Sequence, residues 1–188
     1  MFILFTAEEI EDRDKKIDDL IYQMSLGDKD AIGKLYELIS DIVYAYALSK
    51  MKDTHDAEDV MHDTFVKIFR YASRYVKQGK PMAWIFTIEI NIIKRHKELK
   101  GRHISYDESI GEDVPCEVSA EENLIKSDLV SKMLNVLDEA EREIVILHAV
   151  SGLKHREIAS LIGIPLATVL SKYSRAIKKI QKEMEEEL

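Results

Sequence analysis

The chain has 188 residues, of which 46% are hydrophobic and 33% are charged, and its formal net charge is −8. Seven glycines and three prolines are few for a β-rich protein, so the composition favours an all-α fold. The single cysteine, Cys116, excludes an internal disulfide and suits a reducing compartment, so we expect a cytoplasmic protein. The overall acidity argues against indiscriminate nucleic-acid binding, and any such contact must come from local basic islands.

The N-terminal region predicts two helices. Residues 1–5 are apolar, but the run is too short to cross a membrane and no basic residue precedes it, so we expect no membrane span and no signal peptide. Thr6-Ala-Glu-Glu9 is a capping box that begins a helix over residues 7–25. Gly27-Asp28 combines a stop signal with an N-cap, and a second helix with a broad apolar face is predicted over residues 29–50.

A third helix is predicted over residues 54–70, and Asp53 can cap its N-terminus. Its first half is strongly acidic, which suits a helix N-terminus and presents a negative surface to a basic partner. The carboxylates beside the apolar stripe of this helix are Asp56, Glu58, Asp59 and Asp63.

The same helix could also be read as a metal site, because His55, Asp59, His62 and Asp63 fall within about two turns. A metal site usually takes ligands from a second element at matching spacing. The other histidines are scattered along the sequence, so we expect no metal and no cofactor.

A basic loop over residues 71–80 leads to a fourth helix over residues 81–100, which Pro81 can start. From residue 80 to residue 100 there are five basic and two acidic residues. An aromatic ring, a hydroxyl, an amide and cations along one helix can stack, hydrogen-bond and neutralise phosphates, as unpaired bases require. The residues of this stripe are Trp84, Thr87, Asn91 and Lys94, with Arg95 beside it. The alternative is that Trp84 belongs to the core and the cations are merely solvated.

The helical periodicity breaks over residues 101–122, which hold seven acidic residues and one basic residue. Self-repulsion should keep such a segment extended as a linker. Ser119-Ala-Glu-Glu122 is a second capping box, which begins a helix to about Leu137. We therefore predict two small helical domains, residues 1–100 and 123–188, joined by an acidic linker.

The C-terminal domain predicts a helix-turn-helix. Three short helices are separated by breaks at Ser151-Gly152 and at Gly163, and Pro165 starts the last of them. On that helix the apolar positions that should face the core are Val169, Tyr173, Ala176, Ile177 and Ile180. The opposite face carries small polar and basic residues, and residues 165–180 hold four basic residues and no acidic one. This face suits a DNA major groove, whereas the alternative is a solvated amphipathic helix in an ordinary bundle.

Three stretches, in this order, resemble a bacterial RNA polymerase sigma factor of the extracytoplasmic-function (ECF) group of the sigma-70 family. Residues 56–70 look like the family's core-polymerase-binding helix. Residues 80–91 look like the segment that melts and reads the minus-10 element. Residues 141–147 together with residues 157–169 look like the domain that reads the minus-35 element.

The resemblance implies a role for each surface. The residues that would meet basic clamp helices of the polymerase large subunit are Asp56, Glu58, Asp59, Val60 and Asp63. The loop over residues 75–80 would capture a base flipped out of the non-template strand. The residues on the minus-10 side would be Lys77, Lys80, Trp84, Thr87, Asn91, Lys94 and Arg95. The residues on the minus-35 side would be Lys154, Thr168, Ser171, Lys172, Arg175 and Lys178. The acidic linker would thread the polymerase channel and imitate phosphate.

The chain departs from the family pattern at several positions. Arg95 stands where the family commonly has Asp, and Asp138 stands where Pro is customary. Ala167-Thr-Val169 replaces the common Gly-Thr-Val, and Lys172-Tyr173 replaces Arg-Leu. Leu170 occupies a position that is usually basic, which removes one phosphate contact and should lower the salt slope of DNA binding by about one. These changes bear on promoter strength and sequence rather than on the fold.

We therefore expect a sigma factor, a specificity subunit with no catalytic activity and no small-molecule substrate. Its partners would be core RNA polymerase, promoter DNA and an anti-sigma factor. One alternative is a stand-alone helix-turn-helix regulator, which would bind an operator as a dimer without polymerase. The other is a degenerate sigma-like protein that acts mainly through protein partners and initiates poorly.

Overall fold

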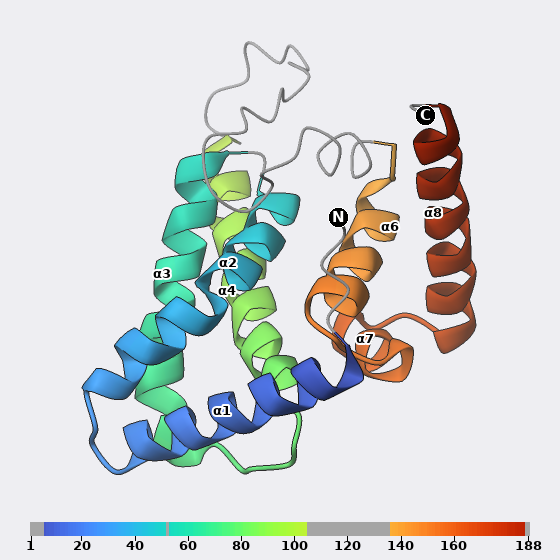
Figure 1. The fold of residues 1–188 in the computed structure, drawn as a ribbon. Helices are drawn as coiled ribbons and strands as arrows, with labels where there is room; N and C mark the ends of the chain where they lie inside the picture. Colours follow the sequence, from blue (N-terminus) through green and yellow to red (C-terminus); the bar gives the residue numbers. More distant parts are fainter. Residues whose placement is uncertain (1–5, 52, 105–135, 187–188) are drawn as a thin grey trace.

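The computed structural model describes residues 6–51, 53–104 and 136–186, and the regular structure in these ranges is entirely helical (Figure 1). The elements are α1 (Ala7–Ser25), α2 (Asp30–Lys50), α3 (Thr54–Tyr71), η1 (Ala72–Arg74), α4 (Pro81–Ile104), α6 (Glu139–Val145), η2 (Ile146–Val150), α7 (His155–Ile162) and α8 (Leu166–Glu186). The all-α prediction is confirmed. Most of the predicted acidic linker, Cys116 and most of the helix predicted to begin near Ser119 lie outside the described residues.

Local signals set the ends of these helices close to where the sequence predicts them. The Thr6 hydroxyl accepts a hydrogen bond from the Glu9 N–H at 3.2 Å, and the Glu9 carboxylate accepts one from the Thr6 N–H at 2.7 Å. Asp53 caps α3 by accepting two backbone N–H groups of the first turn. Gly163 ends α7 with φ of 73°, a left-handed conformation that a residue with a Cβ adopts only at a cost.

The N-terminal half is a small helical bundle. Helices α2, α3 and α4 lie side by side, and α1 crosses one end of them and reaches toward the C-terminal helices (Figure 1). Large side chains fill the bundle, and each contributes about 1.5–3 kcal/mol when it is fully buried. Those with less than 2% exposure include Ile17, Ile21, Leu35, Ile39, Tyr46, Ile68, Met82, Ile85 and Phe86. This packing fixes which sides of α3 and α4 remain outside.

The C-terminal half holds the helix-turn-helix. Helix α6 continues into η2, a five-residue π-helical segment that was not predicted. The chain leaves this segment at Gly152, which has φ of 76°, so the predicted break is in place. Helices α7 and α8 follow, and the inner face of α8 is buried through Val169, Ala176 and Ile180. Among the described residues, no helix has both the length and the apolar character that crossing a bilayer needs.

The two halves share one apolar core. Ile144, Leu147 and Ile158 of the C-terminal half belong to the same cluster of buried residues as Tyr46 and Phe86 of the bundle. The division into domains of residues 1–100 and 123–188 remains a prediction, because buried residues of both halves belong to this one cluster.

Polar contacts reinforce the junction between the halves. The Tyr46 hydroxyl donates a hydrogen bond to Glu143 at 2.7 Å, and the Lys50 ammonium lies 2.8 Å from the same carboxylate. From the first half of α1, the Arg13 guanidinium donates to the Ser151 carbonyl at 2.7 Å and to the Val150 carbonyl at 3.3 Å. A cation at the carbonyl end of a helix is favourable, because those carbonyls have no partner within the helix.

Glu89 is an exception to the apolar interior of the bundle. Its side chain is 0% exposed on α4, and neither carboxyl oxygen has a hydrogen-bond partner within the described residues. Burial raises the pKa of Glu89 well above its ordinary value. The folded protein therefore holds this proton more tightly than the unfolded chain does.

The raised pKa of Glu89 predicts a loss of stability with rising pH. The stabilising contribution of the protonated carboxyl is complete below its ordinary pKa of 4.5 and is lost as the pH rises through the folded-state pKa. The expected slope in this window is about 1.4 kcal/mol per pH unit. Urea unfolding at a series of pH values should show a flatter profile for Glu89→Gln than for the parent. Glu98→Gln, at an exposed position of the same helix, is the control and should keep the parent slope; equal profiles for Glu89→Gln and the parent would refute the interpretation.

Candidate protein-binding and nucleic-acid-binding surfaces

The acidic surface of α3 lies on the outside of the bundle. Glu58, Asp59 and Asp63 are exposed, as a contact with a basic partner requires. Asp56 is only 16% exposed in its side chain, and its carboxylate lies 3.9 Å from the ring of His96 on α4. Three of the four predicted carboxylates are thus accessible, and Asp56 sits at the edge of the surface.

Val60 does not belong to this surface. The resemblance grouped it with the carboxylates, but its side chain is 0% exposed and packs in the core cluster. The structure corrects the prediction: Val60 cannot touch a partner while α3 is packed on the bundle, and it instead holds the helix in place.

An apolar groove beside the carboxylates was missed by the sequence analysis. It runs between α2 and α3, and Phe69 and Val66 on its rim are 39% and 48% exposed. Tyr36 lies next to it, 37% exposed, with its ring 4.9 Å from that of Phe65. Phe69 continues the apolar stripe of α3 in the sequence, but this stripe is wider than the face that α2 covers, so Phe69 stays 39% exposed. The excess width of the stripe is the signal that could have indicated the groove.

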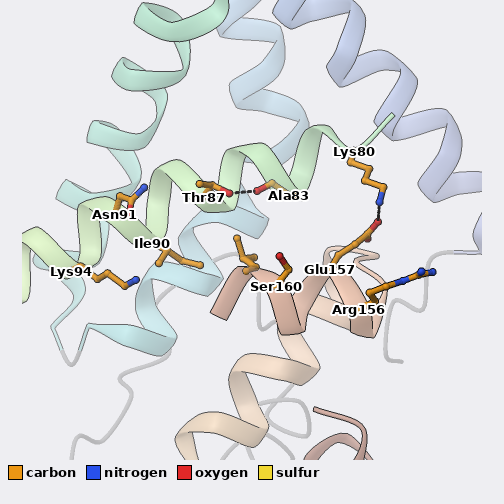
Figure 2. Close-up of a pocket in the computed structure, with 10 residues that line it drawn as sticks. Lys80, Ala83, Thr87, Ile90, Asn91, Lys94, Arg156, Glu157 and Ser160 are labelled. Atoms are coloured by element: carbon orange, nitrogen blue, oxygen red, sulfur yellow. Dashed lines mark hydrogen bonds and ion pairs between the residues drawn. The ribbon is translucent and has the colours of Figure 1, made fainter. Parts of the chain in front are cut away.

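Three of the predicted minus-10 residues, Thr87, Asn91 and Lys94, lie along one side of a cleft between α4 and α7 (Figure 2). Thr87, Asn91 and Lys94 are exposed on α4, as is the neighbouring Arg95. The Thr87 hydroxyl donates to the Ala83 carbonyl at 2.8 Å, so it is already partnered within the helix. Helix α7 covers the side of α4 on which Thr87, Asn91 and Lys94 lie.

One ion pair closes the end of this cleft. The Lys80 ammonium lies 2.7 Å from the carboxylate of Glu157 on α7 (Figure 2). The other oxygen of Glu157 accepts the backbone N–H of Lys154 at 2.9 Å at the start of α7. Burial would raise the pKa of Glu157, but the bonds to Lys80 and Lys154 outweigh it and lower the pKa. Glu157 is therefore an ionised carboxylate that holds a residue predicted to bind DNA.

Trp84 and the loop before α4 are held from the side of α1. Trp84 is half-buried, and its ring centroid lies 4.8 Å from that of Tyr75. Lys77 is exposed and lies 3.0 Å from the carboxylate of Asp19. Trp84 thus packs against protein on one side, which the sequence analysis left open.

The polar side of α8 points away from the core. Ser171, Arg175 and Lys178 are exposed, whereas Thr168 is half-buried. The Ser171 hydroxyl donates to the Thr168 carbonyl at 3.0 Å. Lys154, at the start of α7, is also exposed. This side of the helix-turn-helix offers small polar groups and cations together, the set that contacts phosphates and base edges.

Two further residues modify this surface. Lys172 is half-buried, and its ammonium lies 3.6 Å from the Asp138 carboxylate. A hydrogen bond from the Glu141 backbone, aided by the charge of Lys172, lowers the pKa of Asp138. Leu170 is 47% exposed on the outer side of α8 and adds an apolar patch where a cation would strengthen phosphate binding.

Beneath this surface, three rings pack between η2, α7 and α8. His148 and His155 stack with their centroids 4.1 Å apart, and Tyr173 meets both edge-on. Burial lowers the pKa of His155, and the adjacent His148 lowers it further. The lowered pKa favours a neutral His155 imidazole beneath α8.

Sequence profiles of two protein families match the chain. Sigma-70 region 2 matches residues 35–103, and Sigma-70, region 4 matches residues 127–180, so that together they cover more than half of the chain. The first range contains the acidic surface and α4, and the second contains the helix-turn-helix.

Individual proteins give the same result. The chain is 27% identical to the ECF RNA polymerase sigma factor BldN of Streptomyces coelicolor, over 86% of this chain and 63% of BldN, so it spans less than two thirds of that relative. It is 24% identical to the ECF RNA polymerase sigma-E factor of Haemophilus influenzae, over 95% of this chain and 98% of that protein. The sigma factor RpoE of Bartonella quintana, crystallised with the anti-sigma factor NepR, superposes with a TM-score of 0.61 at 26% identity, over 81% of this chain and 96% of that one.

A helical bundle with an acidic surface on α3, followed by a helix-turn-helix with an exposed basic side, fits a transcription protein that contacts both protein and DNA. The chain belongs to the sigma-70 family, in its ECF group, and is a promoter-directing sigma factor for RNA polymerase. Sigma factors as a family are not catalytic enzymes.

Proposed function

We propose that the three surfaces divide the work of initiation. The α3 surface binds core polymerase, α4 with the loop before it binds and helps to melt the minus-10 element, and the helix-turn-helix binds the minus-35 element. The observation that supports this proposal is that most residues of each predicted set are exposed and lie within the matching family region, whereas Val60 is buried. The protein would act in the cytoplasm as a non-catalytic subunit that needs no cofactor.

Two features support polymerase binding through α3. The exposed carboxylates Glu58, Asp59 and Asp63 suit a basic partner, and complementary charge mainly speeds encounter and sets orientation. The adjoining groove, rimmed by Val66 and Phe69, offers the apolar area that the centre of an interface needs. Together they form a patch with an apolar middle and an acidic edge.

Charge reversal on α3 tests this assignment. Asp59→Arg with Asp63→Arg should weaken binding to core polymerase at least about a hundredfold, because like charges placed across an interface cost several kcal/mol. Affinity can be measured by fluorescence anisotropy of labelled protein titrated with core enzyme. Glu8→Arg with Glu11→Arg, two exposed positions of α1, carries the same change of net charge and should bind as the parent does. If both pairs lose affinity equally, the effect belongs to net charge and not to α3.

DNA binding by α4 requires the two halves to separate. The Lys80–Glu157 ion pair and the position of α7 occupy the side of α4 that is proposed to meet the non-template strand. The minus-10 and minus-35 elements lie about 25 base pairs apart, or about 85 Å along B-form DNA. Helices α4 and α7 face each other across one cleft, so both elements cannot be read in this arrangement.

A reversible tether tests the need for separation. An ideal Cβ at Gly152 would lie 2.8 Å from Cγ2 of Ile10, so cysteines at these two positions bring their side chains together. The φ of 76° at Gly152 adds backbone strain to this substitution, which the reduced protein carries as well. Ile10→Cys with Gly152→Cys, combined with Cys116→Ser, should form a bridge between α1 and the C-terminal half. We expect the oxidised protein to lose promoter-dependent transcription at least about tenfold and dithiothreitol to restore it. The Ile10→Cys, Cys116→Ser variant controls for oxidation, and full activity of the bridged protein would rule out obligatory separation.

We further propose an anti-sigma factor as a partner. This rests on the likeness to RpoE, whose crystal structure contains the anti-sigma factor NepR. Such a partner would restrain the protein until promoters are to be read.

Transcription in vitro tests the function as a whole. Core polymerase with this protein should start RNA at a defined set of sites on fragments of the source genome, and sequencing of RNA 5′ ends should reveal a shared upstream pattern. Core polymerase alone is the control. Polymerase binding without specific starts would favour a degenerate sigma-like protein, and tight operator binding without polymerase would favour a stand-alone regulator; either result would refute the proposal.

A further inference from the structure

The loop over residues 75–80 is tied to the protein at its two ends and, between them, by the exposed ion pair of Lys77 with Asp19 of α1. Residues 76–80 are all exposed, and Val76 has 67% of its side chain in solvent. With so little packing, the position of the loop depends on its few specific contacts. At its far end Lys80 is bound to Glu157 of α7, a contact that the proposed separation would remove.

At its near end the loop is tied to α1 by Asp18. The hydroxyl of Tyr75 donates a short hydrogen bond to the Asp18 carboxylate, and the Tyr75 ring packs on Trp84 at the start of α4. Burial and the bond to Asp18 raise the pKa of the Tyr75 hydroxyl, which therefore keeps its proton as a donor. Asp18 on α1 thus holds Tyr75, the first residue of the loop, and the Tyr75 ring in turn packs against Trp84.

Asp18 is a poor choice for stability alone. Its side chain is 2% exposed on α1 between Ile17 and Ile21, which are both fully buried. Burying a carboxylate costs free energy that one hydrogen bond recovers only in part, and an apolar residue would pack there without that cost. A buried hydrogen bond does, however, select a single orientation of the group that it holds.

We propose that Asp18 is a positioning residue for promoter opening: through Tyr75 it holds the 75–80 loop and Trp84 in the arrangement that receives the displaced DNA strand. The inference rests on the proposed minus-10 role of this loop. When α7 leaves α4, the Lys80 contact is lost while the Asp18–Tyr75 contact, which lies within the N-terminal half, stays. The loop is then released at its far end and remains fixed at its near end.

The first test needs no DNA. Trp84 is the only tryptophan of the chain, so its fluorescence reports this site directly. Asp18→Ala should increase the acrylamide quenching constant of Trp84 about twofold, because the Tyr75 ring is no longer held over the indole. Asp18→Asn keeps an oxygen acceptor for the hydroxyl and should stay near the parent value. Asp12→Ala, which removes an exposed carboxylate of the same helix, is the matched control and should change nothing.

The second test measures opening by the holoenzyme. Permanganate reactivity of thymines is followed on a promoter fragment recovered from the 5′-end mapping. Asp18→Ala and Tyr75→Phe should each reduce open complexes about tenfold, as loss of a hydrogen bond to a charged group does. The double variant should be no worse than either single variant, since both remove the same bond. Core affinity and protection of the minus-35 element should stay at parent levels, and Asp18→Asn should recover opening to within about twofold.

The outcomes separate a positioning role for Asp18 from a purely structural one. Unchanged quenching in Asp18→Ala, or additive effects of the two substitutions, would overturn the inference. A parallel loss of core affinity, minus-35 protection and opening would show that Asp18 only stabilises the fold, and would overturn it equally. Trp84→Ala and Lys77→Ala test the loop itself: if both open promoters normally, the proposed minus-10 role fails, and the inference fails with it whatever the quenching shows.

Discussion

The contact between α7 and α4 covers the side of α4 that is proposed to bind DNA. Its visible link is the Lys80–Glu157 ion pair, whose side chains are 55% and 14% exposed. Such a pair contributes no more than about 1 kcal/mol, because solvent screens it and long side chains must be ordered. The shared apolar cluster, into which Ile158 and Leu147 are fully buried, contributes more, since one large buried side chain is worth about 1.5–3 kcal/mol. Burial therefore holds the halves together, and the ion pair fixes how α7 lies on α4.

Several other basic residues of the molecule are also held by carboxylates of the protein, as Lys80 is. In a chain of net charge −8, cations find carboxylates close by: Lys77 pairs with Asp19, and Lys172 with Asp138. Lys179 on α8 lies 2.6 Å from the almost fully buried Glu141. Phosphate must compete with these carboxylates before it gains a contact, so the net gain is smaller than a count of cations suggests. DNA would displace these carboxylates from their lysines only where several phosphates bind several of the lysines at the same time.

The sequence allowed the helices to be predicted, because their ends depend on neighbours along the chain. The capping box at Thr6 and the left-handed Gly163 are local signals, and both lie where they were predicted. The sequence did not predict contacts between distant segments. Helical periodicity indicates that Asp18 shares a turn with buried residues, but it does not indicate that the Tyr75 hydroxyl donates a hydrogen bond to Asp18. Val60 shows a related limit, since a motif marks a helix as a binding element without saying which of its residues face outward. The groove at Phe69 shows the same limit. The sequence places Phe69 in the apolar stripe of α3, but it does not show that Phe69 stays 39% exposed.

The weak points of the proposed minus-35 surface suit a subunit that binds DNA together with polymerase, as we propose. Leu170 is exposed where a cation would add a phosphate contact, and Lys172 is engaged by Asp138. A stand-alone regulator must draw all of its affinity from such a surface. A sigma factor bound to polymerase presents its DNA surfaces together, so that the second contact forms at a high effective concentration once the first exists. Modest affinity at each surface is then sufficient, and it keeps the acidic free protein from occupying DNA without the enzyme. The apolar junction between the halves would act in the same direction, because under the proposed separation α4 meets DNA only after α7 has moved away from it.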